Sequence, residues 1–171
     1  MKVKILRVDD NKLVNALVRK GVKTEMPSMQ NGWRFSFNKH IKKPNSEAYV
    51  LVKEDTPKII EGCMIYQVLG NGIQYMAFVE VAPRNRLPNK TYDLVAGCLI
   101  AYACKLSMQR GKDFHKGYLT FDVQEESKKD GIKLMSMYSE NYKAVRIDET
   151  TMWISPENGE LLIEEYLNRK T

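Results

Sequence analysis

Cysteine and histidine are scarce in this chain of 171 residues, which has three cysteines and two histidines. The cysteines, Cys63, Cys98 and Cys104, form no CxxC pair, so neither a zinc site nor a disulfide framework is expected. Free thiols fit a reducing compartment, and we therefore expect a cytoplasmic protein. His40 and His115 are too few for a histidine-rich metal centre, and we expect each of them at the surface or at a strand edge.

Long apolar runs are also missing. The longest covers residues 94–104 and is too short for a bilayer, which needs about 20 residues. The first ten residues lack the apolar stretch of a secretory signal peptide, so no membrane partner is expected. Lysine and arginine number 27 against 21 acidic residues, and the net charge of +6 permits an anionic partner without naming one. The length fits one domain over residues 1–171.

The first 45 residues have the weakest periodicity. Residues 3–8 alternate weakly and predict a short strand. Residues 10–21 predict a helix, with Asp10 as its N-cap and Gly21 as its stop. Residues 33–37 alternate aromatic and polar side chains, which predicts a strand with its aromatics in the core. Lining of an acceptor pocket is the alternative for those aromatics.

The rest of the chain has clearer patterns. The expected strands are residues 48–52, 59–69, 73–82, 117–123, 144–147 and 151–154, and the expected helices are residues 93–110, 131–141 and 157–167. The first three strands predict an antiparallel meander, and the strand–helix–strand order that follows predicts a near-parallel pair. Ser155 and Pro156 fit the N-cap and first position of the last helix. The predicted fold class is α+β (mixed α/β), a mostly antiparallel sheet flanked by helices.

A ligand site is expected at the carboxyl end of strand 73–82, because the following helix offers unpaired N–H groups to an anion. This strand, the loop and helix after it, and the segment 134–144 resemble the GNAT N-acetyltransferase superfamily. The resemblance covers roughly residues 59–154, and the Val-Ala-Gly start of the helix at residue 95 is similar to a group of bacterial GNAT-like proteins.

The resemblance implies a GNAT-like fold in which the parallel strands splay and the pantetheine arm of acetyl-CoA lies in the gap. It assigns the backbone contacts to that arm to Phe78, Val79 and Val81. It also assigns the pyrophosphate to the amides at the start of the helix, which are those of Val95, Ala96 and Gly97.

The sequence departs from the family's phosphate loop, [Gln/Arg]-x-x-Gly-x-[Gly/Ala]. Ala96 and Leu99 match the last loop position and the leucine after it, which places Leu94 at the first glycine and Thr91 at the Gln/Arg position. A leucine side chain would sterically hinder a phosphate from approaching the backbone at this position. In addition, the Asp93 side chain is available to cap the same helix. Three cations precede the helix and offer side-chain donors instead, with a solvated basic loop as the alternative reading: Arg84, Arg86 and Lys90.

Acetyl transfer to an amine needs a base that removes a proton from the acceptor ammonium and an acid that protonates the leaving thiolate. The resemblance puts the acid at Tyr138, and Tyr142 lies on the same helix face and is a substitute. Glu80 is the acid on the central strand and the candidate base, with Asp122 as the weaker alternative. The alternatives are that Tyr138 is a packing residue and that Glu80 points to solvent.

We therefore expect an enzyme, an N-acetyltransferase that moves acetyl from acetyl-CoA, its cosubstrate, to a primary amine on an unidentified acceptor, without a metal. The alternative is a GNAT-like non-catalytic binding or interaction module with a degenerate acyl-CoA loop. Nucleic acid is not the expected partner, because the basic turn at residues 39–43 is short and no nucleic-acid motif is recognisable. The oligomeric state stays open, a homodimer included.

Overall fold

Within residues 1–170, one mixed sheet of nine strands forms the centre of the fold, in the order β6-β1-β2-β3-β4-β5-β7-β9-β8. The computed structural model describes residues 1–170. Its strands are β1 (Lys2–Arg7), β2 (Lys12–Lys20), β3 (Ser46–Lys53), β4 (Thr56–Val68), β5 (Gln74–Val81), β6 (Tyr92–Asp93), β7 (Leu119–Asp122), β8 (Val145–Arg146) and β9 (Thr151–Ile154). Among them β5 and β7 pair in parallel and the other neighbours are antiparallel. The predicted meander and the predicted parallel pair are both confirmed.

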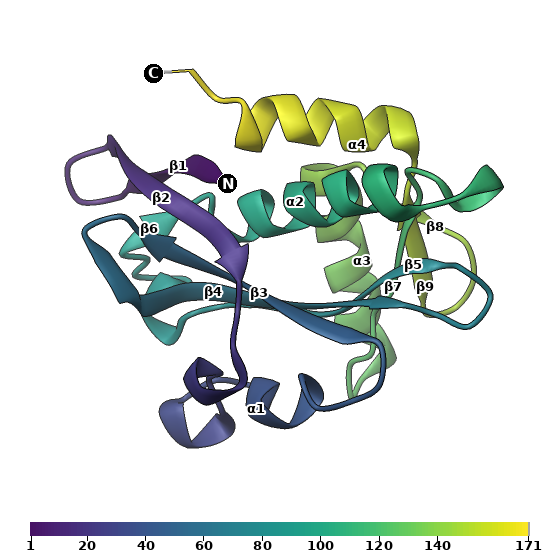
Figure 1. Ribbon diagram of the computed structural model, residues 1–171, viewed down its shortest axis with the longest axis horizontal. Helices are drawn as coiled ribbons and strands as arrows, with labels where there is room; N and C mark the ends of the chain where they lie inside the picture. Colours follow the sequence, from purple (N-terminus) through teal and green to yellow (C-terminus); the bar gives the residue numbers. More distant parts are fainter. Residues whose placement is uncertain (171) are drawn as a thin grey trace.

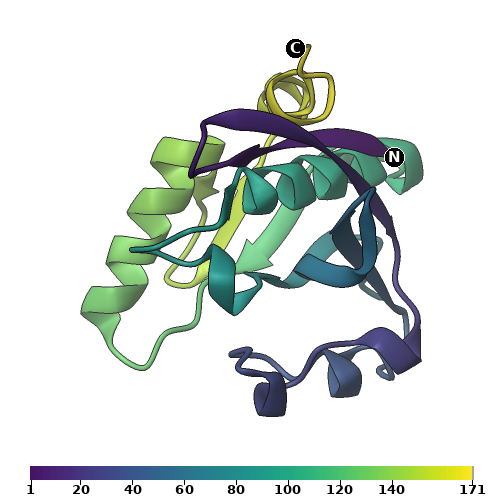
Figure 2. The ribbon, with the colours of Figure 1, turned by 90° about the vertical axis from the view of Figure 1, so that its left-hand side faces the viewer.

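Helices cover both faces of this sheet (Figures 1 and 2). The helices are α1 (Phe37–His40), α2 (Val95–Arg110), α3 (Lys128–Tyr142) and α4 (Pro156–Leu162), and a π-helical turn, Ile163–Leu167, continues α4. The Ser155 side chain caps α4, as predicted, by accepting from the Asn158 amide. No helix in the part of the chain that the structure describes is long and apolar enough to cross a membrane.

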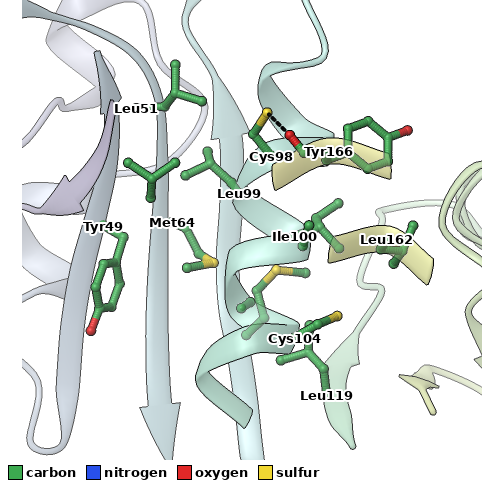
Figure 3. Packing of buried hydrophobic residues seen from close by; sticks show 14 of the residues in the cluster. Tyr49, Leu51, Met64, Cys98, Leu99, Ile100, Cys104, Leu119, Leu162 and Tyr166 are labelled. Carbon is green, nitrogen blue, oxygen red and sulfur yellow. Dashed lines mark hydrogen bonds between the residues drawn. The ribbon is translucent and has the colours of Figure 1, made fainter. Parts of the chain in front are cut away.

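The main hydrophobic core lies between the sheet and helices α2, α3 and α4. Figure 3 shows the part of it around α2 and the α4 segment. Helix α2 is buried on most sides, because the sheet lies under it and the α4 segment over it. Cys98 and Cys104 pack there as small apolar side chains, as predicted, and burial raises the pKa of the Cys98 thiol to about 12. A second, smaller core lies under the opposite face, between α1 with its flanking loops and the middle strands.

The predicted helix over residues 10–21 is wrong, because this segment is strand β2. Leu13, Leu17 and Val18 have helical spacing, but Ala16 and Val18 alternate into the core with the period of a strand. β2 pairs with β1 on one side and β3 on the other, so tertiary pairing decides the structure. Asp10 caps no helix and instead accepts hydrogen bonds from the Arg7 guanidinium in the β1–β2 turn.

The predicted strand over residues 33–37 is also wrong. Trp33 lies in a loop and Phe37 begins α1, and both side chains are buried in the second core. Their rings meet edge to face with centroids 5.8 Å apart. The backbone N–H groups of Arg34 and Phe35 donate to a side chain, Glu80, and so do not form a strand ladder.

Strand β5 contains a β-bulge at Ala77. Ile65 lies opposite Phe78 and Tyr66 lies opposite Met76, which leaves Ala77 as the extra residue. The bulge puts Met76 on the same face as Val79, toward the main core, while Phe78 packs toward the second core. A bulge bends and twists a strand, and this one lies two residues beyond Tyr75, where β5 pairs with β7.

Gly97 is required by close packing between α2 and the π-helical turn. A Cβ built on Gly97 would lie 2.0 Å from the ring of Tyr166. The Gly97→Ala substitution is therefore expected to lower the free energy of unfolding by about 1–3 kcal/mol through overpacking, measured by urea denaturation. Gly131→Ala in α3 is the matched control, because nothing lies within 4 Å of its Cβ position, and it should be neutral or stabilising. Equal losses in the two variants would contradict this account.

Candidate functional site

A cavity of about 390 Å³ separates β5 from β7. The register joins the two strands at Tyr75 and Thr120, and the cavity opens beyond that pair. Its walls are mostly aromatic and aliphatic, with a polar rim; the lining residues are Arg34, Phe35, Lys43, Gln67, Tyr75, Met76, Ala77, Phe78, Val79, Phe121, Asp122, Val123, Gln124, Glu125, Leu134 and Tyr138. The cavity therefore lies where the predicted gap between the parallel strands should be.

The backbone of β5 turns hydrogen-bonding groups toward this gap. The Ala82 amide donates to the Glu61 carbonyl on β4, at 2.8 Å. Antiparallel pairing alternates along a strand, so the N–H and C=O groups of Glu80 also face β4, and those of Val79 and Val81 face β7. Val79 and Val81 therefore offer an open strand edge beside the cavity, whereas the backbone of Phe78 faces β4 and its side chain lines the cavity.

Tyr138 reaches the cavity from α3. Its ring packs on that of Phe121, with centroids 4.9 Å apart, and burial raises the pKa of its hydroxyl. A phenol with a raised pKa keeps its proton through the neutral range and can donate it, as a general acid must. Tyr142 lies farther along α3, with its ring 6.2 Å from that of Tyr166, and packs against the main core.

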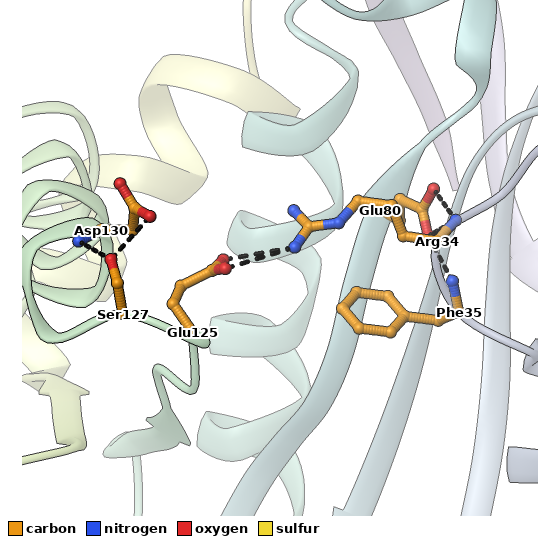
Figure 4. Close-up of polar contacts among 6 residues, drawn as sticks. All are labelled: Arg34, Phe35, Glu80, Glu125, Ser127 and Asp130. Carbon is orange, nitrogen blue, oxygen red and sulfur yellow. Dashed lines mark hydrogen bonds and ion pairs between the residues drawn. The ribbon is translucent and has the colours of Figure 1, made fainter.

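Glu80 is buried, and other groups already engage its carboxylate. The oxygens accept from the Arg34 amide at 2.9 and 3.1 Å and from the Phe35 amide at 3.0 Å (Figure 4). One of them also pairs with the Arg86 guanidinium. These contacts hold the loop around Arg34 against β5. The role of Glu80 as general base stays a prediction, and its contacts favour a positioning role, because its oxygens are committed to the loop.

The start of α2 keeps the backbone shape expected of a glycine. Leu94 has a φ of +70°, in the left-handed region that favours glycine and costs other residues about 1–2 kcal/mol. The first α-helical hydrogen bond runs from the Cys98 amide to the Leu94 carbonyl, so the amides of Val95, Ala96 and Gly97 precede it. The leucine side chain packs against the main core.

Asp93 does not cap the first turn of α2. Its Oδ1 accepts from the adjacent Leu94 amide at 2.8 Å and from Lys90 Nζ at 3.0 Å. The expected capping of the helix by Asp93 is therefore not seen in the structure, and Asp93 leaves the amides of the first turn to other partners.

Each of the three cations before α2 is paired with a carboxylate. Arg84 binds Glu61, which is fully buried, and Arg86 binds Glu80; both acids come from neighbouring strands. Lys90 binds Asp93 within its own loop. Glu61 lies 23 residues before Arg84, so local sequence does not reveal that pair, whereas Glu80 precedes Arg86 by only six residues.

Arg34, Phe35 and Glu125 line the cavity, and sequence reasoning did not single out Arg34 or Glu125. Arg34 Nη2 lies 3.3 Å from Glu125 Oε1, which joins the loop before α1 to the loop after β7 (Figure 4). The only sequence signal for Glu125 is its place just after a predicted parallel strand. Asp122, the weaker base candidate, accepts from the Tyr75 hydroxyl at 2.6 Å and from two threonines, Thr150 and Thr151.

Comparisons with known proteins identify the fold. A scan against protein-family models and a search of curated sequences gave no match. Solved structures do match: a chain of the KacTA–DNA complex has a TM-score of 0.60 at 8% identity, covering 88% of this chain and 99% of that one. A chain of AtaTR bound with acetyl-CoA has a TM-score of 0.56 at 10% identity, covering 86% and 98%.

Mutant forms of the spermidine/spermine N-acetyltransferase SpeG from Vibrio cholerae match with a TM-score of 0.52 at 13% identity, covering 85% of this chain and 96% of that chain. These likenesses, together with the mixed sheet and its parallel pair, confirm the expected fold. The chain has the fold of the GNAT acetyltransferases.

Glu80 is expected to hold the Arg34 loop in place. In the Glu80→Gln variant, loss of the charged acceptor should speed hydrogen exchange at the Arg34 and Phe35 amides at least tenfold, because hydrogen bonds to charged groups contribute about 1.5–3 kcal/mol. Hydrogen exchange followed by NMR measures this. Glu126→Gln is the control, because Glu126 is exposed. Unchanged exchange at both amides in Glu80→Gln would contradict the positioning role.

Proposed function

We propose that this chain is an N-acetyltransferase, which transfers the acetyl group of acetyl-CoA to a primary amine. The observation that carries the proposal is the cavity between β5 and β7, with the open backbone edge of Val79 and Val81 on one side and the Tyr138 side chain on the other. Two similar structures support it: one is of SpeG, a spermidine/spermine N-acetyltransferase, and one contains acetyl-CoA.

The residues at the site suit both the pantetheine arm and the pyrophosphate of acetyl-CoA. The cosubstrate would supply an activated acetyl group as a thioester. Val79 and Val81 would bind the pantetheine amides as an added strand does. The amides of Val95, Ala96 and Gly97 would face the pyrophosphate at the positive end of α2. Lys90 is the most available cation, because its pair with Asp93 is short-range and partly exposed.

In the proposed reaction the chain moves two protons. The acceptor nitrogen gives up a proton to a base, so that its lone pair can form the new C–N bond as the C–S bond breaks. Tyr138 would donate its hydroxyl proton to the leaving sulfur and recover one from solvent. The Tyr138 side chain suits this step, because burial keeps it protonated near neutral pH.

A non-catalytic interaction module is the second candidate function. The paired state of Arg84, Arg86 and Lys90 favours it, because none of these cations is free to meet a phosphate without giving up a carboxylate. A calorimetric titration with acetyl-CoA separates the two functions. We expect saturable binding in the micromolar range, and no binding at millimolar concentration would overturn the acetyltransferase proposal.

Tyr138→Phe tests the catalytic role. The substitution removes the proton donor and leaves the ring, so we expect turnover to fall by about 10²–10⁴-fold while the acetyl-CoA Kd stays within about twofold. Release of CoA thiol with a panel of primary amines measures turnover. Tyr142→Phe, on the same helix, is the control and should retain activity. If Tyr138→Phe stays fully active and Tyr142→Phe does not, Tyr142 is the acid.

A further inference from the structure

The carboxylate of Glu125 differs from the other acid of the cavity in the partners that bind it. Among residues 1–170, the acidic side chains that line it are Asp122 and Glu125. The Asp122 carboxylate accepts hydrogen bonds from the hydroxyl groups of Tyr75 on β5, Thr150 in the turn before β9, and Thr151 on β9. Glu125 is mostly buried, and the partner seen for its carboxylate is the guanidinium of Arg34.

The backbone of Arg34 is held firmly, whereas its side chain makes only weak contacts, with Glu125 and with the Phe35 ring, whose centroid lies 5.6 Å from Arg34 Cζ. Its amide donates to both oxygens of Glu80, which fixes the main chain beside the cavity. Its side chain is 58% exposed and meets Glu125 at 3.3 and 3.5 Å, distances at the weak end for a charged hydrogen bond. Exposed ion pairs contribute little to stability, so the guanidinium can leave Glu125 for solvent or for a competing cation without moving the loop.

The surroundings of this ion pair suit the apolar part of an amine. Phe35, Phe78 and Phe121 line the same cavity, and Tyr138 lies close enough for Arg34 and Glu125 to act on its hydroxyl electrostatically. A cation bound at Glu125 would thus lie beside the proposed proton donor, with apolar walls around the carbon chain attached to it.

We propose that Glu125 is the binding site for the ammonium group of a small cationic acceptor, and that the Arg34 guanidinium occupies this site until the acceptor displaces it. The proposal deepens the acetyltransferase function and rests on it. It makes the acceptor a protonated aliphatic amine that fits a cavity of about 390 Å³, part of which the acetyl arm would fill. Glu125 would select the positive charge, and Arg34 would exclude neutral molecules that cannot replace it.

The test uses the full chain labelled with ¹⁵N and follows the Nε–H signal of Arg34, which the Arg34→Lys variant identifies by its disappearance. The probe is n-butylammonium chloride, titrated at constant ionic strength, with butan-1-ol as the neutral match. We expect a saturable shift with the amine and none with the alcohol. Absence of a saturable shift with the amine, or an equal shift with both, would overturn the proposal.

Two acid variants form the matched pair. Glu125→Gln should weaken n-butylammonium binding about tenfold, and Glu126→Gln, at the exposed neighbouring position, should leave it unchanged. Arg34→Ala, followed through the Phe35 and Glu125 amide signals, should tighten binding about 1.5- to 5-fold by removing the internal competitor. Equal weakening in Glu125→Gln and Glu126→Gln would overturn the assignment to Glu125.

Calorimetry with acetyl-CoA on the same samples separates this proposal from the function on which it rests. If acetyl-CoA binds and n-butylammonium leaves Arg34 unmoved, the ammonium site fails and the acetyltransferase proposal stands. If n-butylammonium displaces Arg34 and acetyl-CoA does not bind, the cation site stands and the acetyltransferase proposal fails.

Discussion

The buried carboxylate of Glu80 ties together the parts of the fold that surround the cavity. It projects from the C-terminal end of β5, accepts hydrogen bonds from the backbone N–H groups of Arg34 and Phe35, and pairs with Arg86 in the loop that leads to α2. One charged group thus positions a cavity wall and the connection to the helix. A buried carboxylate is stable only when its oxygens are satisfied in this way, so the loop and the strand specify each other.

Glu61 repeats this arrangement on the adjacent strand. It is fully buried and binds Arg84 and the Asn85 side chain, while Asn85 Oδ1 accepts from the Tyr92 amide. The two acids therefore fix the loop between β5 and α2 at both of its arginines. The cations of this loop are paired with carboxylates inside the molecule, so an anionic ligand would have to displace a carboxylate to bind them.

Sequence patterns predicted the segments whose hydrophobic periodicity agrees with their packing in the fold, and they failed where the periodicity and the packing conflict. Helix α2 and strands β4 and β5 are long and rich in apolar residues, so their sequence pattern identifies them. Strand β2 has leucines at helical spacing, and only its pairing with β1 and β3 makes it a strand. The loop around Trp33 depends on a contact between Arg34 and Glu80, which are 46 residues apart, and no local sequence pattern contains such a contact.

The candidate site was predictable to the same extent. Tyr138 and the edge of β5 lie in segments whose sequence resembles a family, whereas Arg34 and Glu125 come together only in the folded chain.

Leu94 shows how this site can depart from a glycine loop and keep its backbone. A left-handed φ costs a leucine about 1–2 kcal/mol, and the burial of a leucine side chain in a core contributes about as much or more. Because the Leu94 side chain packs against the main core, its burial can offset the strain that a glycine would avoid. The first turn of α2 thus begins from a left-handed residue without a glycine at that position. Backbone groups, in this turn and along the edge of β5, carry the part of the proposed site that does not depend on side-chain identity, which leaves side chains such as Glu125 to decide which acceptor is bound.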